Sequence, residues 1–469
     1  MIRCGIDFGT TNSSAALVVD NQVQVLELDL LNDNASSLPS LLYVSREGEQ
    51  IVGRAAANAF IERNVGREVK LEQVDLGVAI DAYVGAEPDK SEGYRPRPDH
   101  GEVREAVRAL ATVEVNSPGR LFHSVKSFLR HRKFTGTEVF GEHYQIEQLV
   151  SMILRPIREQ IEAHTGDEVG AVVMGRPVRF SDDADEDQLA EERLRRAARI
   201  AGFSDIVFFH EPVAACIEYA VSPGKPQTLM VVDIGGGTCD VCIMEFSGSQ
   251  EAAKRLSESR ILAVGGIPIA GDAIDREIIR SKVFPCLGSR SRYGPSRLPM
   301  PQSIYAGITD WQSLYRLNTE DTIYWLIAVE ASSTQPEAIR SLRSIIQRNY
   351  GYPIVRKVEQ AKKMLSEDWE APIEVHHAHQ IDISVKLGRS EFTHIIEPIM
   401  SDMLRSIIDT ERAAGLEPSQ IDYVLTTGGT CLIPAVRHML VRRYGEERLM
   451  QRDTFTSVAA GLAIIAEYL

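Results

Sequence analysis

Two short segments of this chain place an acidic residue directly before a turn rich in glycine and threonine. Residues 7–12 read DFGTTN, and residues 233–238 read DIGGGT. Successive backbone N–H groups in such a turn form an anion-binding nest, and glycine permits both the backbone angles and the close approach. The pattern predicts polyphosphate binding. The candidate phosphate contacts are Gly9, Thr10, Thr11, Asn12, Gly235, Gly236, Gly237 and Thr238.

The acidic residues predict how the phosphate charge is offset. Magnesium prefers oxygen ligands and usually keeps several waters. If the two turns face each other, Asp7 and Asp233 point at one magnesium ion, most simply through its waters. Glu211 lies at a strand-to-helix junction, where it is placed to orient an attacking water. Phosphoryl transfer requires mainly this positioning and charge compensation.

A third motif, Gly428-Gly429-Thr430, lies between a predicted strand and a predicted helix. Backbone N–H groups at such a junction can approach a phosphate or a ribose. The alternative is that the first two motifs are unrelated β-hairpins whose glycines serve turn geometry alone. The segment 233–238 is longer and richer in glycine than a hairpin turn needs, and its aspartate interrupts an apolar run. The three motifs together therefore favour a nucleotide site.

The elements that must position these residues repeat within the chain. Residues 2–19 and 229–246 both read as strand, tight turn and strand, and residues 421–440 read as strand, turn and helix. Similarity at about half the chain length predicts an internal duplication and two lobes of related design, built as an α/β fold.

The composition shifts along the chain predict where the lobes meet. We expect lobe I over 1–222, decorated by a polar region at about 72–118, and lobe II over 223–450, with a loop-rich insertion at about 281–324. Residues 451–469 are predicted to form a C-terminal helix that returns to lobe I.

The bulk properties narrow the partners. Hydrophobic residues make up 44% and charged residues 25% of the 469 residues, an ordinary globular balance. The formal net charge of −15 argues against a nucleic-acid backbone or an anionic membrane as the main partner. No apolar run is long enough to span a bilayer, and residues 1–5 lead directly into a strand-like pattern, so a cytoplasmic location is expected.

Two other clusters could bind a metal, but the sequence favours structural roles for both. Cys239 and Cys242 form a CxxC, which is a redox or zinc signature in some proteins. Here it falls in a predicted strand, where positions three apart point to opposite faces. The cluster at residues 376–379 (HHAH) has no further ligand nearby in sequence and reads as an exposed strand or turn.

The segments DFGTTN, DIGGGTCD and LTTGGTCLIP resemble the two phosphate motifs and the adenosine motif of the actin, sugar-kinase and heat-shock chaperone superfamily. HEPVAACIEYA and VEQAKKMLS are more similar to the nucleotide-binding domain of the 70-kDa heat-shock (DnaK-type) chaperones, and GYPIVRKVEQAKKMLS to the short bacterial YegD-like proteins. The resemblance implies a duplicated actin-like, ribonuclease H-like ATPase fold with a nucleotide cleft between its lobes. It also implies ATP or ADP and Mg²⁺ as cofactors.

Residue roles follow from the same resemblance. Asp7, Glu211, Asp233 and Asp240 match the family's catalytic and metal-positioning acids. The implied nucleoside contacts are Gly271, Glu359, Lys362, Ser366, Gly428 and Gly429. Because the sequence ends at Leu469, we expect a protein without the family's peptide-binding β-domain, which acts by nucleotide-dependent lobe closure read by a protein partner that the sequence does not identify.

The chain departs from the family pattern at the expected cation. The family carries a catalytic lysine in a GDAAKN segment, whereas residues 53–58 read GRAAAN and place Ala57 there. Loss of a cation beside the γ-phosphate removes transition-state stabilisation. Slow or absent ATP hydrolysis is therefore expected, with Arg54 a weak substitute. Leu432 and Phe455 also differ from the family's adenine-side residues, which leaves base preference open.

Two other functions remain open for a chain of this superfamily. An actin-like filament protein would sediment in an ATP-dependent manner. A small-molecule kinase would show ATP turnover that rises steeply with one added sugar, but no further acid clearly serves as its catalytic base.

Overall fold

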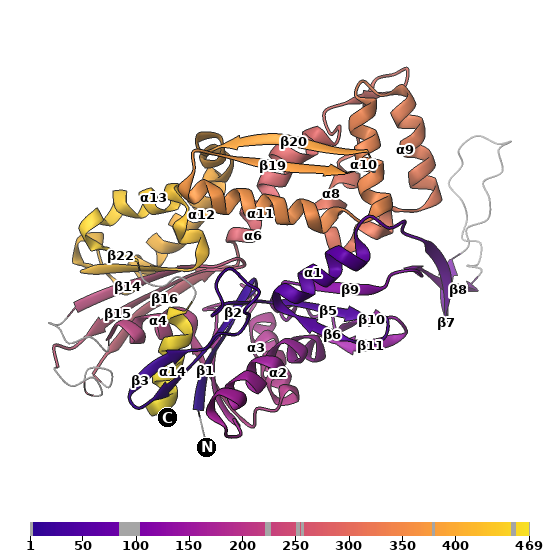
Figure 1. The fold of residues 1–469 in the computed structure, drawn as a ribbon. Coiled ribbons are helices and arrows are strands. Elements are labelled where there is room, and N and C mark those ends of the chain that lie inside the picture. The colour runs from indigo at the N-terminus through magenta and orange to yellow at the C-terminus, as the bar shows by residue number, and fades with distance from the viewer. Residues whose placement is uncertain are drawn as a thin grey trace, which may run out of the picture.

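The computed structural model describes residues 3–83, 104–220, 227–249, 254, 258–377, 380–451 and 456–468. Its centre consists of two mixed β-sheets with the same strand order (Figure 1). In each sheet an antiparallel three-stranded meander continues into two parallel strands. This shared order confirms the predicted α/β fold and its internal duplication.

The first sheet has the order β13-β12-β1-β2-β3, with the short β4 paired to β2. Its strands are β1 (Arg3–Phe8), β2 (Asn12–Val19), β3 (Gln22–Val25), β4 (Leu38–Pro39), β12 (Ala171–Arg176) and β13 (Asp205–His210). The second sheet has the order β16-β15-β14-β21-β22. Its strands are β14 (Gln227–Ile234), β15 (Cys239–Phe246), β16 (Arg260–Ile267), β21 (Tyr423–Thr427) and β22 (Leu449–Gln451).

Amphipathic helices cover the sheets. On the first sheet, α2 (Ile146–Thr165) and α3 (Ala184–Ala201) pack together and bury an aliphatic face. The Asp183 carboxylate caps α3 by accepting from the N–H groups of Asp185 and Glu186, and Gly202 ends it at a positive φ of 109°. The second sheet is covered by α6 (Gly271–Ile278), α12 (Arg389–Ala414) and α13 (Pro434–Tyr444).

Two helices connect the sheets. The C-terminal α14 (Ser457–Tyr468) lies against β1, β2 and α4 (Glu211–Ala220), and α4 packs on β14 and β15 (Figure 1). Glycine permits the close approach, because a Cβ on Gly5 would collide with the backbone of Ala463, and one on Gly461 with the Ala214 carbonyl. One apolar cluster runs through β12, α4, β14, β21 and α14.

A smaller unit is formed by residues 41–145, between β4 and α2. It contains a three-stranded sheet with the order β6-β5-β9, a hairpin of β10 and β11, and a long hairpin of β7 and β8 in the region predicted as a polar decoration. The bounds are β5 (Leu41–Ser45), β6 (Gln50–Val52), α1 (Gly53–Asn64), β7 (Leu71–Tyr83), β8 (Arg104–Glu114), β9 (Gly119–His123), η1 (Val125–Phe128), β10 (Gly136–Val139) and β11 (Glu142–Gln145).

The insertion predicted to be rich in loops is largely helical. Its elements are η2 (Ile279–Val283), α7 (Phe284–Cys286), β17 (Arg292–Tyr293), β18 (Leu298–Pro299), α8 (Gln302–Thr309), η3 (Trp311–Leu317) and α9 (Glu320–Ser332). Pro285 and Pro301 lie at or just before helix starts, where proline is tolerated. Tyr305 and Trp311 are buried and supply the packing that stabilises these short helices.

The second half of the chain contains further helices and a two-stranded hairpin. These elements are α10 (Pro336–Arg348), α11 (Gly351–Glu367), β19 (Glu370–His377), β20 (Ile381–Gly388), η4 (Pro418–Gln420), η5 (Gly429–Leu432) and η6 (Glu446–Arg448). No helix in the described ranges is both long and apolar enough to cross a membrane.

The insertion meets α1 in what we call the tip contact, formed by Phe60, residues 66–69, Trp311, Asn318 and residues 347–352 (Figure 1 shows α1 below α8 to α11). The Phe60 ring lies 5.6 Å, centroid to centroid, from the rings of both Trp311 and Tyr352. The backbone N–H groups of Gly66 and Val69 donate to the carbonyls of Arg348 and Gln347 at 2.9 and 3.0 Å. The tip contact therefore joins the first and second halves of the chain far from the central sheets.

Candidate active site

The structure brings the second and third glycine turns together. The Thr430 hydroxyl donates to the Gly235 carbonyl at 2.8 Å, and the N–H of Gly271, at the start of α6, donates to the same carbonyl at 3.2 Å. Gly428 has a φ of 80°, and a Cβ there would collide with the Ile234 carbonyl. Only glycine fits this approach.

The first turn faces the second across the two halves of the chain. A Cβ on Gly236 would collide with the Thr11 hydroxyl, and one on Gly237 would lie 2.7 Å from the Thr10 hydroxyl. The Thr11 Oγ1 is buried and has no hydrogen-bond partner in the protein. A buried hydroxyl without a partner is costly. This orphan between two glycine turns fits a bound phosphate oxygen.

Other residues of the turns already have partners. The Gly9 carbonyl accepts a hydrogen bond from the Ser40 hydroxyl at 2.8 Å. Asn12 opens β2 and pairs with Pro39 of β4. Thr238 bonds to the Asp240 carboxylate through its side chain. The Gly235 N–H itself donates to the Thr238 carbonyl, so the N–H groups of Gly236 and Gly237 and the hydroxyls of Thr10 and Thr11 are the better candidates for phosphate contacts.

The four predicted acids gather beside the turns. Asp7 lies near the end of β1 and Asp233 near the end of β14, each opposite a residue of the next strand: Ser14 for the first, Asp240 for the second. Glu211 is the first residue of α4. The Asp240 carboxylate accepts from the Val178 N–H at 2.8 Å. We call Asp7, Glu211, Asp233 and Asp240 the acid cluster.

The pKa values show that these carboxylates repel one another. Burial, reinforced by the charge of Glu211, raises the pKa of Asp7 to about 7 and that of Asp240 to about 7. Burial also raises the pKa of Asp233 well above its ordinary value, and the charges of Glu211 and Asp7 add to the effect. Such shifts indicate a site that lacks positive charge.

Sequence reasoning missed Lys126, the lysine that partly offsets this charge. Its Nζ donates to the Glu211 Oε1 at 2.6 Å, and the two side chains are only 6% and 9% exposed. Burial lowers the pKa of Lys126, but the charges of Glu211 and Asp7 raise it more, so the ammonium stays protonated. The available signal was one lysine inside the apolar run LFHSVKSFL, residues 121–129.

The residues fit a hydrated magnesium ion better than a directly bound metal. No three His, Cys, Asp or Glu side chains in the described part of the chain are grouped to hold a metal directly. Four carboxylates and one lysine nevertheless leave an excess of negative charge. Magnesium that keeps its waters and shares phosphate oxygens meets both conditions.

The predicted nucleoside contacts lie on α6, α11 and the third turn. The Lys362 ammonium donates to the Asp275 carboxylate at 2.6 Å and to the Gly271 carbonyl at 3.2 Å. Burial raises the pKa of Asp275 to about 7, with Lys362 opposing and Glu359 adding to the shift. Ser366 lies one turn beyond Lys362 on α11, and Gly429 opens η5. Asp275 is a second residue that sequence reasoning missed.

The remaining residues considered from the sequence are the CxxC pair, the two adenine-side residues and the histidine cluster. Cys239 and Cys242 are buried in different apolar clusters, on opposite faces of β15, as predicted for structural thiols. Leu432 ends η5. Phe455 and His379 lie outside the described residues.

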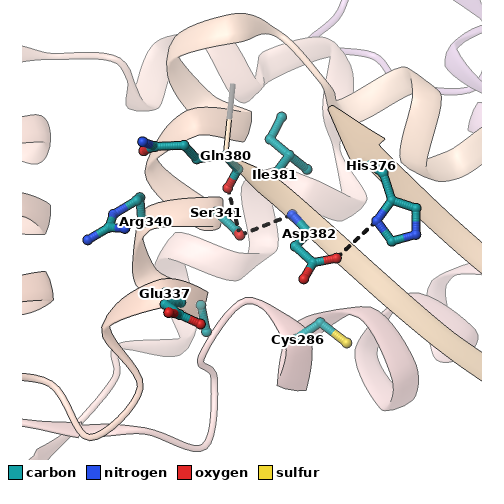
Figure 2. A pocket seen from close by; sticks show the side chains of 9 residues that line it. Cys286, Glu337, Arg340, Ser341, His376, Gln380, Ile381 and Asp382 are labelled. Atoms are coloured by element: carbon teal, nitrogen blue, oxygen red, sulfur yellow. Dashed lines mark hydrogen bonds and ion pairs between the residues drawn. The ribbon is translucent and has the colours of Figure 1, made fainter. Parts of the chain in front are cut away.

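A separate surface pocket of about 840 Å³ lies between α10 and β20 (Figure 2). The His376 Nδ1 lies 3.0 Å from the Asp382 carboxylate. The Ser341 hydroxyl donates to the Gln380 carbonyl at 3.1 Å and accepts from the Asp382 N–H at 3.2 Å. Of the predicted site residues, none lines this pocket, so it is separate from the acid cluster.

The duplicated sheets, the three facing turns and the acid cluster define an actin-like ATPase fold. A family model described as Hsp70 protein matches residues 121–256 and 346–469. The chain therefore belongs to the Hsp70 family.

Relatives of known name agree with that assignment. The chain is 24% identical over 469 residues to "Chaperone protein DnaK" of Thermus thermophilus, covering 98% of this chain and 60% of that protein. It is 24% identical over 467 residues to "Chaperone protein DnaK 1" of a Synechococcus strain, covering 98% of this chain and 49% of that protein. The chain thus spans about half to three fifths of the length of these relatives.

Proposed function

We propose that this protein is an Hsp70-type nucleotide switch, which binds ATP or ADP with magnesium between its two halves. The observation that carries the proposal is the buried, unpartnered Thr11 hydroxyl, which lies against Gly236 of the second glycine turn. The acid cluster adds the excess negative charge that a hydrated cation offsets. The chaperone names of the relatives support a chaperone-type role over a filament protein or a sugar kinase.

The proposed output is an opening and closing of the two halves about the nucleotide. We assign residues 1–222 with 451–469 to one moving body and residues 223–450 to the other. The tip contact joins the two bodies, so it must separate for wide opening. A protein partner, not identified by these residues, would read the open or closed state. Slow hydrolysis of ATP would set how long the protein stays in its ATP-bound state.

The nearest test is binding of labelled ATP with and without magnesium, measured by equilibrium dialysis. The wild-type protein should bind one ATP, and Gly236→Ala should abolish binding because its Cβ collides with Thr11. Gly388→Ala is the matched control, since a Cβ there meets nothing within 4 Å. Absence of ATP binding by the wild-type protein, or full binding by Gly236→Ala, would overturn the proposal.

A further inference from the structure

The family position for the catalytic cation is not part of the acid cluster. Ala57 lies on α1, is 1% exposed, and belongs to an apolar cluster with Phe60 and Tyr352. Arg54 is also engaged elsewhere. Its guanidinium donates to the Asn32 side chain at 2.9 Å and lies 3.6 Å from Asp33. Neither residue supplies positive charge to the acids.

Lys126 supplies that charge from another segment. It lies in η1, directly after β9, and its ammonium reaches Glu211 at the start of α4. The ammonium also lies within electrostatic range of Asp7, Asp233 and Asp240. The Phe180 ring, 5.9 Å from the Nζ, closes another side. The charge of Lys126 opposes the rise in pKa of all three aspartates.

The turn that carries Lys126 is held in an uncommon conformation. Ser124 has a φ of 55°, which is rare for a residue other than glycine. Its hydroxyl pairs with the His123 Nδ1 at 2.9 Å, and the Ser127 hydroxyl donates to the Ser124 carbonyl at 2.7 Å. Strained backbone of this kind persists when the surrounding contacts over-determine it, and it clusters at functional sites. Here it directs one lysine into a buried group of acids.

We propose that Lys126 is the positioning residue that makes this chain competent for ATP hydrolysis despite Ala57. Lys126 holds the Glu211 carboxylate in the place from which it can orient the attacking water. This inference rests on the proposed nucleotide site. In the reaction, the oxygen of water bonds to the γ-phosphorus while the bond from that phosphorus to the bridging oxygen breaks. The products are ADP and inorganic phosphate, and the proton lost by water passes to solvent.

The test is a single-turnover assay with labelled ATP and magnesium, read together with ATP affinity. Lys126→Met should keep ATP affinity within a few-fold and slow hydrolysis roughly 100-fold, the cost of removing one preorganised charge or donor. Lys126→Arg should restore part of the rate, because it returns the cation. Lys133→Met is the matched control: Lys133 is exposed on the same segment and should leave both readouts unchanged.

A lone buried carboxylate is strongly destabilising, so Lys126→Met could unfold the protein. The double variant Lys126→Met/Glu211→Gln removes both charges and keeps the proposal testable. It should fold, bind ATP and hydrolyse as slowly as Glu211→Gln alone. Equal hydrolysis by wild type and by the variants lacking Lys126, or tight ATP binding by wild type without any ADP formed, would overturn the inference. Failure of wild type to bind ATP would overturn the proposed function itself, and the two failures are therefore distinguishable.

Discussion

The acid cluster and the tip contact both contain residues from the two halves of the chain, but they are built from different kinds of interaction. The acid cluster is built from buried charges around three glycine turns. The tip contact is built from aromatic rings and backbone hydrogen bonds. The Hsp70 model matches parts of both regions: Lys126, Glu211, Asp233 and Asp240 of the first, and residues 347–352 of the second.

The two regions therefore bear on two different properties, the chemistry at the nucleotide and the opening of the two halves. In the proposed switch, the acid cluster is assigned the binding of magnesium and the hydrolysis of ATP. The tip contact is assigned the rate at which the halves separate and the nucleotide enters and leaves. One hydrogen bond links the two regions, since the Gln312 side chain of η3 donates to the His123 carbonyl at 3.1 Å, three residues before Lys126.

The largest effect is expected from Asp233→Asn in the acid cluster. Loss of this carboxylate weakens the hold on a hydrated magnesium ion, and we expect magnesium-dependent ATP affinity to fall about 100-fold. Isothermal titration with Mg·ATP measures it. Asp205→Asn, at the exposed start of β13, is the control and should bind normally. Unchanged affinity in Asp233→Asn would show that this carboxylate does not help to hold the magnesium ion.

A smaller effect on rate is expected from Phe60→Ala in the tip contact. Each aromatic pair contributes about 0.5–1.5 kcal/mol beyond its buried area, so losing two pairs should speed release of a fluorescent nucleotide about tenfold. The hydrolysis rate of bound ATP should not change. Tyr324→Ala is the control, because Tyr324 lies on α9 with a 69% exposed side chain. Unchanged release from Phe60→Ala would show that nucleotide leaves without opening the tip.

A single hydrogen bond of the tip contact should have a still smaller effect. The Asn318 side chain donates to the Val69 carbonyl at 2.7 Å. Its loss in Asn318→Ala costs about 1 kcal/mol, so nucleotide release should accelerate only a few-fold in stopped-flow measurements. An effect as large as that of Phe60→Ala would mean that hydrogen bonds, and not the aromatic rings, hold the tip contact together.

The smallest effect is expected in the number of protons that the protein releases when Mg·ATP binds. Because the pKa values of Asp7 and Asp240 are raised to about 7, the ligand-free protein binds protons that the unfolded chain has already lost. Their contribution to stability is full below the ordinary carboxyl pKa of about 4 and is lost as pH rises through 7. Bound magnesium favours the ionised forms, so Mg·ATP binding at pH 6.5 should release protons.

Calorimetry in two buffers of different ionisation enthalpy measures this proton release, and Asp7→Asn should reduce it. Equal heats in both buffers would show that the two carboxyls are already ionised before the ligand arrives.

The turns and the duplication were predictable because both are local patterns. An acid, a glycine-rich turn and a strand recur in DFGTTN and DIGGGT, and backbone geometry alone explains them. Lys126 was not predictable in its role, since its partner Glu211 is 85 residues away. The helices α8 and η3 were missed because prolines and scattered aromatics suggest loops, while burial of Tyr305 and Trp311 against distant residues stabilises helices. Lys362 was assigned from resemblance, but its partner Asp275 was not.

The close packing of α14 on β1 has a consequence for biosynthesis. Strand β1 leaves the ribosome long before the helix that covers it at Gly5 and Ala463, because most of the described sequence separates the two elements. Contacts between such distant residues form late, because closing a long loop costs entropy before any contact is gained. During translation the first sheet therefore waits with one face uncovered until residues 457–468 emerge, and the nascent chain itself needs protection from aggregation over that interval.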